Sequence, residues 1–194
     1  NDVMTIGAAN LRLSQAVDIA GAAATASSTI TSVTLTGGGV TNAAGTAVST
    51  FDLDSGANVT LSTIDATGLA GNLDLAGTGA ATTAAGASIL LGSGNNSVTL
   101  ALTDAVRDSV TVNGGDGTDT LILASGNNAT YRPGATSIET VSYSVNATQT
   151  GATVLDGTDA GAVTKINLSV DHPTNATDAN NTIQNFASLE TITV

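Results

Sequence analysis

Residues 112–123 read Val-Asn-Gly-Gly-Asp-Gly-Thr-Asp-Thr-Leu-Ile-Leu, so that three glycines and two carboxylates directly precede an apolar run. Glycine adopts backbone conformations that other residues avoid, which lets several carbonyl oxygens of one turn point into a single pocket. Carbonyl and carboxylate oxygens are the ligands that calcium prefers. The stretch is therefore compatible with two structures, a tight β-turn or a turn that holds a cation.

A related stretch begins 23 residues earlier in the chain. Residues 91–100, Leu-Gly-Ser-Gly-Asn-Asn-Ser-Val-Thr-Leu, align with residues 114–123, which places Asn96 on Asp119 and one apolar run on the other. One coil of a parallel β-helix is a repeat of this kind. A second repeat, at an offset of 51, relates residues 137–141 (SIETV) to residues 188–192 (SLETI), which contain the only two glutamates of the chain. These repeats favour a stacked solenoid, with a β-sandwich as the alternative.

Short apolar runs alternate with Gly, Asn, Asp and Ser along the rest of the chain, a pattern typical of strands and turns. The predicted strands are residues 3–6, 16–19, 30–35, 48–53, 59–64, 73–75, 89–91, 98–102, 110–112, 121–123, 138–145, 163–170 and 189–194. We expect an all-β fold, a parallel β-helix or β-roll-like solenoid. An Ala/Thr/Gly-rich segment at 1–88 would precede the repeat-bearing segment at 89–194, unless 1–194 is one continuous domain.

The charge balance restricts the partners of this chain. Sixteen acidic residues against four basic ones give a net charge of −12, and there is no cysteine. Nucleic acid is not an expected partner because phosphate contacts require clustered Lys and Arg, whereas an acidic surface attracts cations. Without disulfides, bound metal is a substitute source of stability. No apolar run is long enough to span a bilayer, so we expect no membrane insertion.

Signs of catalysis are weak. The single histidine, His172, has neither a cysteine nor a second histidine with which to build a zinc or nucleophile site. The paired carboxylates of a glycosidase remain compatible with a β-helix, but the chain has only two Phe, two Tyr and no Trp with which to stack on sugars. We expect that the chain is not an enzyme, and we rank a polysaccharide-active β-helix enzyme third among its functions.

The nonapeptide Gly-Gly-x-Gly-x-Asp-x-(apolar)-x describes residues 114–122 at every specified position. Residues 91–99 fit it with Leu91 for the first glycine and Asn96 for the aspartate. In this motif the chain resembles the RTX (repeats-in-toxin) family. Its composition and its SIETV-type strands are similar to those of RTX-type surface-layer proteins of Gram-negative bacteria, such as that of Caulobacter. Tandem RTX blocks contain many nonapeptides, whereas this chain has one full copy and one degraded copy.

The resemblance implies an extracellular protein at the bacterial cell surface, secreted by a type I system. We therefore expect a structural, calcium-stabilised component of a secreted surface layer or cell-surface assembly, with a spacer or binding module of an RTX adhesin as the alternative. Its expected partners are other copies of itself in a lattice or filament, with a cell-surface polysaccharide as a second candidate. Because the chain begins NDVMT, we also expect it to be a piece of a longer protein.

The resemblance also implies a set of metal ligands. By position in the motif these are Gly114, Gly115, Gly117 and Asp119, with Gly92, Gly94 and Asn96 in the partner turn and with Asn113 and Asp116 as additional candidates. Weaker candidates are Asp156 and Asp159, because residues 156–159 repeat the tetrapeptide of residues 116–119 without an apolar strand residue at the required place. A plain turn is favoured there. Asp52 and Asp54 alternate on a predicted strand and are expected to face solvent.

Overall fold

The computed structural model describes residues 2–8, 30–37, 48–52, 61–76, 83–100, 110–124, 130–145, 151–170 and 181–194. Every regular element in these ranges is a β-strand, and every pairing between strands is parallel. The predicted all-β parallel solenoid is therefore confirmed. The predicted strand at 16–19 lies outside the described residues. A helix able to cross a membrane is not found in the described ranges.

The strands form three sheets. The six-stranded sheet contains, in order, β1 (Asp2–Ala8), β2 (Ile30–Gly37), β4 (Leu61–Leu69), β6 (Thr83–Leu90), β8 (Thr111–Asn113) and β11 (Gly134–Thr136). The seven-stranded sheet contains β3 (Val48–Asp52), β5 (Asn72–Ala76), β7 (Ser97–Leu100), β9 (Thr120–Ala124), β12 (Thr140–Val145), β14 (Lys165–Val170) and β16 (Thr191–Thr193). The three-stranded sheet contains β10 (Thr130–Tyr131), β13 (Val154–Asp156) and β15 (Thr182–Gln184).

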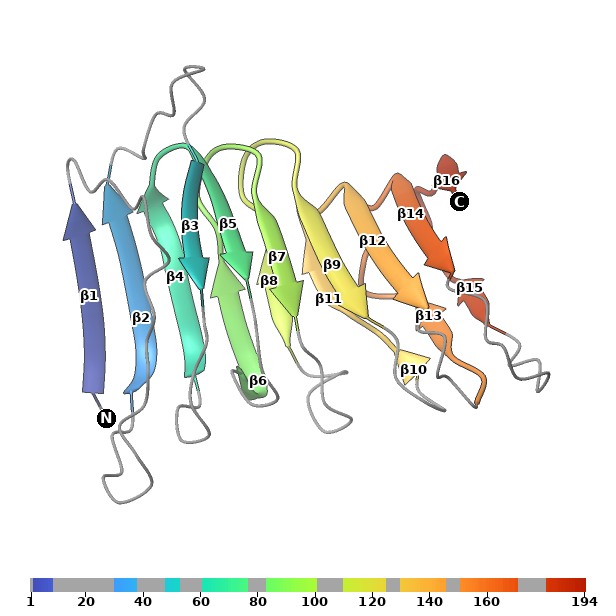
Figure 1. The fold of residues 1–194 in the computed structure, drawn as a ribbon, viewed down its shortest axis with the longest axis horizontal. Helices are drawn as coiled ribbons and strands as arrows, with labels where there is room; N and C mark the ends of the chain where they lie inside the picture. The colour runs from blue at the N-terminus through green and yellow to red at the C-terminus, as the bar shows by residue number, and fades with distance from the viewer. Residues whose placement is uncertain are drawn as a thin grey trace.

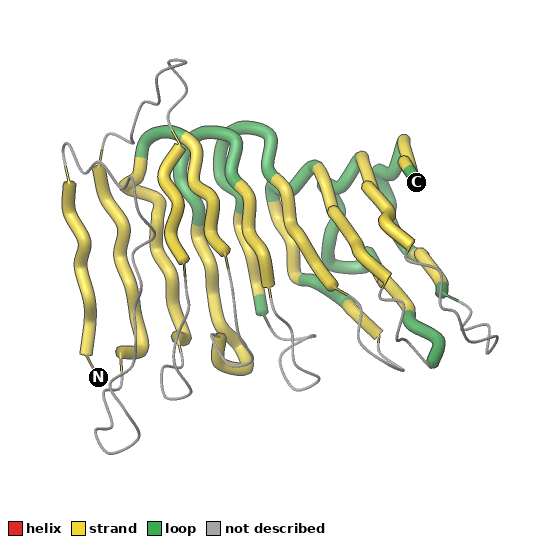
Figure 2. The backbone as a smooth tube through the Cα atoms, viewed as in Figure 1, coloured by secondary structure: helices red, strands yellow, loops and turns green. Residues whose placement is uncertain are grey.

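The chain passes from one sheet to another within each coil, and successive coils follow one another along the long axis of the molecule (Figure 1). The strands of the two large sheets run in opposite directions (Figure 1). The described turns that lead from the six-stranded to the seven-stranded sheet lie along one edge (top of Figure 2). A β-sandwich would pair antiparallel strands that are close in sequence. Here the strands instead pair in parallel with strands of neighbouring coils, which excludes the sandwich.

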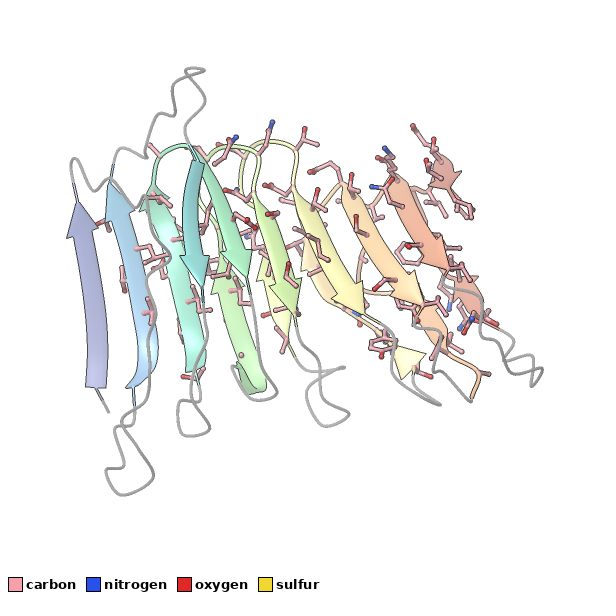
Figure 3. The ribbon with its side chains drawn as sticks, in the orientation of Figure 1. Atoms are coloured by element: carbon pink, nitrogen blue, oxygen red, sulfur yellow. The ribbon has the colours of Figure 1, made fainter. Side chains whose placement is uncertain are left out.

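The core consists of columns of aliphatic side chains, one residue from each coil. On the seven-stranded sheet Leu75, Val98, Leu121, Val141 and Ile166 are in register and fully buried. Residues on β7 and β12 alternate between this interior and the outer face, as the pleat of a strand requires (Figure 3). The buried residues outside this column are likewise mainly Leu, Ile, Val and Ala.

The two tyrosines of the chain lie together at one place in this core. The rings of Tyr131 on β10 and Tyr143 on β12 are both buried, with centroids 5.9 Å apart and an interplanar angle of 65°. Edge-to-face contact of this kind adds to the stability gained from burial. The Tyr143 hydroxyl donates to Thr153 Oγ1 at 2.9 Å, and Thr153 Oγ1 in turn donates to Asn181 Oδ1 at 2.6 Å.

The six-stranded sheet stops at β11. The next coil places β13 against β10 rather than against β11, and the only residues between β10 and β11 are Arg132 and Pro133. A single backbone hydrogen bond, from Ala135 N to Asp159 O at 2.9 Å, ties β11 to the turn after β13. The outer surface of the solenoid therefore has a step between these two sheets.

Candidate cation site at the stacked turns

The two stretches that the sequence aligned occupy equivalent positions in neighbouring coils. Ser97 to Leu100 of β7 pair with Thr120 to Leu123 of β9, an offset of 23 residues. Ser93 bridges Ala70 in the preceding turn and Asp116 in the following one. Backbone hydrogen bonds run from Gly71 N to Ser93 O at 3.1 Å and from Gly94 N to Asp116 O at 2.8 Å. The 23-residue repeat predicted from the sequence is thereby confirmed as the length of the coils that contain these turns.

Glycine is required where the stacked turns approach each other. Gly115 and Gly117 have φ angles of 83° and 134°, which side chains disfavour. A Cβ atom at Gly117 would collide with the carbonyl oxygen of Gly94, and one at Gly115 with that of Gly92. The glycine pattern is therefore explained by close stacking of backbones, independently of any ligand.

Side chains on the outside of the turns form one hydrogen-bonded ladder. Asn72 Oδ1 accepts from Asn95 N at 2.8 Å, and Asn95 Oδ1 accepts from Thr118 N at 3.0 Å. In each case the acceptor belongs to the earlier coil and the donor to the later one. These bonds satisfy backbone donors that the turns would otherwise leave open.

A second ladder lies inside the turns and runs in the opposite direction. Asn96 Oδ1 accepts from Leu73 N at 3.0 Å, Asp119 Oδ1 accepts from Asn96 N at 2.7 Å, and Glu139 Oε2 accepts from Asp119 N at 2.7 Å. Here the acceptor belongs to the later coil each time. Asn96 and Asp119 are the two polar turn residues buried by this stacking, with 3% and 0% of their surfaces exposed.

The remaining atom of each side chain distinguishes Asn96 from Asp119. The Asn96 amide nitrogen donates to the carbonyl oxygens of Gly94, Gly114 and Gly92 at 3.1, 3.2 and 3.4 Å. Asp119 has an oxygen, Oδ2, in the corresponding place, and this buried atom has no hydrogen-bond partner. A carboxylate oxygen cannot donate to carbonyls, so a proton or a cation is needed to make this position favourable.

Burial raises the pKa of the Asp119 carboxyl to about 6. Interactions with the backbone N–H and with the side chain of Asn96 oppose this rise of the pKa, and the nearby charge of Glu139 adds to it. Desolvation disfavours the charged form of a carboxyl group unless an opposite charge compensates it. Among the described residues no Lys or Arg forms an ion pair with Asp119.

The next turn along the solenoid is shorter and closes the site from the other side. Three residues, 137–139, connect β11 to β12, whereas six residues, 114–119, connect β8 to β9. Ser137 takes a left-handed conformation with φ of 50°, and its carbonyl oxygen and Asp119 Oδ2 both lie against the place that a Cβ atom on Gly114 would occupy. The carbonyl oxygen of Ser137 in this short turn thus lies on the same side of Gly114 as the unpartnered carboxylate oxygen.

Glu139 is a member of this site that the motif did not predict. Its side chain bonds to Asp119 N, and Asp119 O accepts from Glu139 N and Thr140 N at 3.2 and 3.0 Å. The offset between Asp119 and Glu139 is 20 residues rather than 23, because the turn has lost three. The signal available in the sequence was the place of Glu139 directly before a strand, which it shares with Asp119.

Some of the predicted metal ligands lie around Asn96 and Asp119, whereas others are exposed on the outside of the turn. Gly92, Gly94 and Gly114 direct carbonyl oxygens at Asn96, and Gly114, Gly115 and Gly117 belong to the same turn as Asp119. Asp116 is exposed at the tip of this turn. Asn113 is exposed at the end of β8, where its Oδ1 accepts from Gly115 N at 3.1 Å.

The chemistry of this donor set suits a hard cation held mainly by backbone oxygens. Among the described residues no three His, Cys, Asp or Glu side chains converge on one point. Calcium accepts carbonyl oxygens together with one or two carboxylates. The turn therefore fits calcium better than zinc or another metal that requires several side-chain ligands.

Asp156 and Asp159 occupy a different environment, although their tetrapeptide matches residues 116–119. Asp156 accepts from Thr158 N and Oγ1 at 3.0 and 2.6 Å, and also from Gln184 and Asn185. These donors, Thr158 first, hold the pKa of Asp156 well below its usual range. Asp159 is ion-paired with Arg132 at 2.8 Å. Both carboxylates already have protein partners and are half-buried or exposed, unlike Asp119.

The side chains of three other residues considered from the sequence cannot be placed in this way. His172 and Asp54 lie outside the described residues, and only the backbone of Asp52, at the end of β3, is described.

Comparison with known proteins adds no relative. The chain matches no protein-family model, and searches of curated proteins and of solved structures find no similar protein.

Proposed function

We propose that this chain is a structural, calcium-stabilised segment of a secreted bacterial cell-surface assembly. The observation that carries the proposal is the buried Asp119 Oδ2, which has no partner at a point where Asn96 presents an amide to three carbonyl oxygens. A calcium ion at this place would supply the positive charge that the amide hydrogens supply one coil earlier. Glu139 and the carbonyl oxygens of residues 114–117 and 137 are the groups available to share it.

The architecture suits a spacer or scaffold. Each coil contacts its neighbours through parallel backbone ladders, and such arrays extend by adding coils. Ile192 continues the core column of Val141 and Ile166 but is 49% exposed, and Val194 is 89% exposed. This face can accept a further coil, either from another copy or from another part of a parent chain. Self-association through strand edges is the corresponding proposal for assembly.

Calcium titration calorimetry tests the metal, with Asp119→Ala and Asp156→Ala as a matched pair. We expect Asp119→Ala to abolish most of the heat of calcium binding and Asp156→Ala to leave it unchanged, because the Asp156 carboxylate is already bound by three side chains. Equal losses in both variants would contradict the assignment of Asp119. Light scattering at rising calcium concentration tests assembly separately, and a segment that stays monomeric would remove self-association from the proposal.

A further inference from the structure

A groove with a volume of about 520 Å³ lies at the step where the six-stranded sheet ends. Its size is typical of sites for small ligands. Its lining includes Leu90, Thr111, Asn113, Thr136, Arg132 and Asp159. None of these side chains belongs to the interior ladder that holds Asp119.

The part of the groove that lies on β8 and β11 carries a grid of three polar side chains, Thr111, Asn113 and Thr136, beside Val110 and Val112. Thr111 is in register with Gly134, and Asn113 with Thr136. Neighbouring strands are about 4.8 Å apart, and alternate residues of one strand are about 6.7 Å apart, so the grid repeats on the scale of a sugar ring. Gly134 has no side chain, and the methyl group of Thr111 lies 3.1 Å from the place that a Cβ atom on Gly134 would occupy. Leu90, in register with Asn113 on β6, adds an apolar side chain.

The amide of Asn113 is oriented by its own turn. Its Oδ1 accepts from Gly115 N at 3.1 Å, so the nitrogen Nδ2 is the atom left to donate. Thr111 Oγ1 donates to Ala87 O at 3.5 Å, which leaves its oxygen lone pairs as acceptors. The floor therefore offers both donors and acceptors in fixed positions.

One wall of the groove carries a guanidinium group that is held in place. Arg132 Nε is 2.8 Å from Asp159 Oδ2, and Asp159 O accepts from Ala135 N of β11 at 2.9 Å. The Arg132 side chain remains 46% exposed, and its two Nη groups have no partner among the described residues. A guanidinium fixed through Nε presents its outer pair of N–H groups in the geometry that matches a carboxylate.

We propose that this groove binds an acidic saccharide, with the sugar carboxylate on Arg132, hydroxyl groups on Asn113 and Thr136, and the apolar face of a ring against Leu90. The net charge of −12 disfavours a densely charged polyanion, because only one guanidinium faces the groove and Asp159 offsets part of its charge. A sugar chain that carries well-spaced carboxylates meets this arrangement with less repulsion. An acidic protein segment could use Arg132 but has no comparable use for the grid of hydroxyl and amide groups.

Titration calorimetry with a hyaluronan tetrasaccharide, which alternates glucuronate with a neutral sugar, tests this assignment. The matched variants are Arg132→Gln and Lys165→Gln, since both remove one positive charge and Lys165 lies on the seven-stranded sheet, away from the groove. Arg132→Lys keeps the positive charge but lacks the paired N–H donors of the guanidinium group. Circular dichroism of each variant verifies that the solenoid is intact. The proposal does not involve Asp119, so the titrations are performed both with calcium and with chelator.

We expect the tetrasaccharide to bind the wild-type protein with a dissociation constant in the millimolar range or below. Loss of the paired charged hydrogen bonds in Arg132→Gln should weaken binding about tenfold or more. Lys165→Gln should leave the affinity for the tetrasaccharide unchanged. The affinity of Arg132→Lys should lie between those of the wild-type protein and Arg132→Gln. The methyl ester of the same tetrasaccharide should bind as weakly as the acid binds to Arg132→Gln.

Three results would overturn the proposal. The first is no binding to the wild-type protein at millimolar tetrasaccharide, and the second is equal weakening by Arg132→Gln and Lys165→Gln, which would reveal an effect of net charge alone. The third is binding of an acidic peptide, such as one with the sequence of residues 113–119, as tight as that of the sugar and equally dependent on Arg132. That result would assign the groove to protein carboxylates instead.

Discussion

Replacing Asp119 by asparagine exchanges one buried carboxylate oxygen for an amide nitrogen and leaves the shape of the side chain nearly unchanged. The structure already contains the arrangement expected in the variant, because Asn96 occupies the same position one coil earlier and donates to three carbonyl oxygens. In the absence of calcium, the exchange should therefore stabilise the protein, contrary to the usual effect of a substitution at a fully buried polar residue.

The expected gain in stability follows from the pKa of Asp119, which burial raises from 3.8 to about 6. One pKa unit corresponds to about 1.4 kcal/mol, so the buried charge destabilises the folded state by about 3 kcal/mol at pH 8. Asp119→Asn removes this unfavourable contribution to the free energy of folding. Calcium at about 100 times its dissociation constant would add about 2.7 kcal/mol to the wild-type protein alone. The variant should thus be more stable in chelator, and the two proteins should become nearly equal in calcium.

Urea unfolding at pH 8, followed by circular dichroism in chelator and in saturating calcium, measures all four free energies. The reasoning is refuted if Asp119→Asn is less stable than the wild-type protein in chelator, since Asp119 Oδ2 would then have a favourable partner. It is refuted equally if calcium stabilises the variant as much as the wild-type protein, because calcium would then act elsewhere.

Three further predictions concern the same turns. In chelator, the wild-type protein should lose stability as the pH rises from about 4 to about 6, because the folded state binds the Asp119 proton more tightly than the unfolded state does; urea unfolding over this range should show the slope in the wild-type protein and not in Asp119→Asn. Asn96→Asp should lower the melting temperature in chelator, since the carboxylate would face three carbonyl oxygens at a cost of about 1–3 kcal/mol, and a variant that melts at the wild-type temperature would contradict this. Gly117→Ala should cost at least about 1–3 kcal/mol, whereas Gly161→Ala, which has open space around the added methyl group, should be neutral in the same thermal melts.

The length of the coils around the glycine turns could be predicted from the sequence, because equivalent turn residues recur at that interval. Glycines at 94 and 117 recur where backbones touch, and the SIETV and SLETI segments, 51 residues apart, lie two coils apart on β12 and β16. The short strands β10, β11, β13 and β15 were missed. They contain two or three residues each, too few to give an alternating pattern, and their strand structure depends on pairing with other coils.

The role of the turn side chains could be predicted only in part. The motif identified Asp119 but not the ladder in which Asn96, Asp119 and Glu139 accept from backbone N–H groups of the preceding coil. The identical tetrapeptides at 116–119 and 156–159 behave differently because their offset of 40 is not a whole number of coils. Burial of a carboxylate is decided by what stacks above and below it, and local sequence does not record this.

The tyrosine pair at β10 and β12 makes the intrinsic fluorescence of this protein a local probe. The chain has no tryptophan and no other tyrosine, so emission reports only on the coils around residues 131 and 143, whereas circular dichroism averages over every strand. In a quasi-one-dimensional array, contacts extend only to neighbouring coils, and distant coils need not unfold together. A difference between the two unfolding midpoints would therefore measure how far cooperativity extends along the solenoid, without any label being introduced.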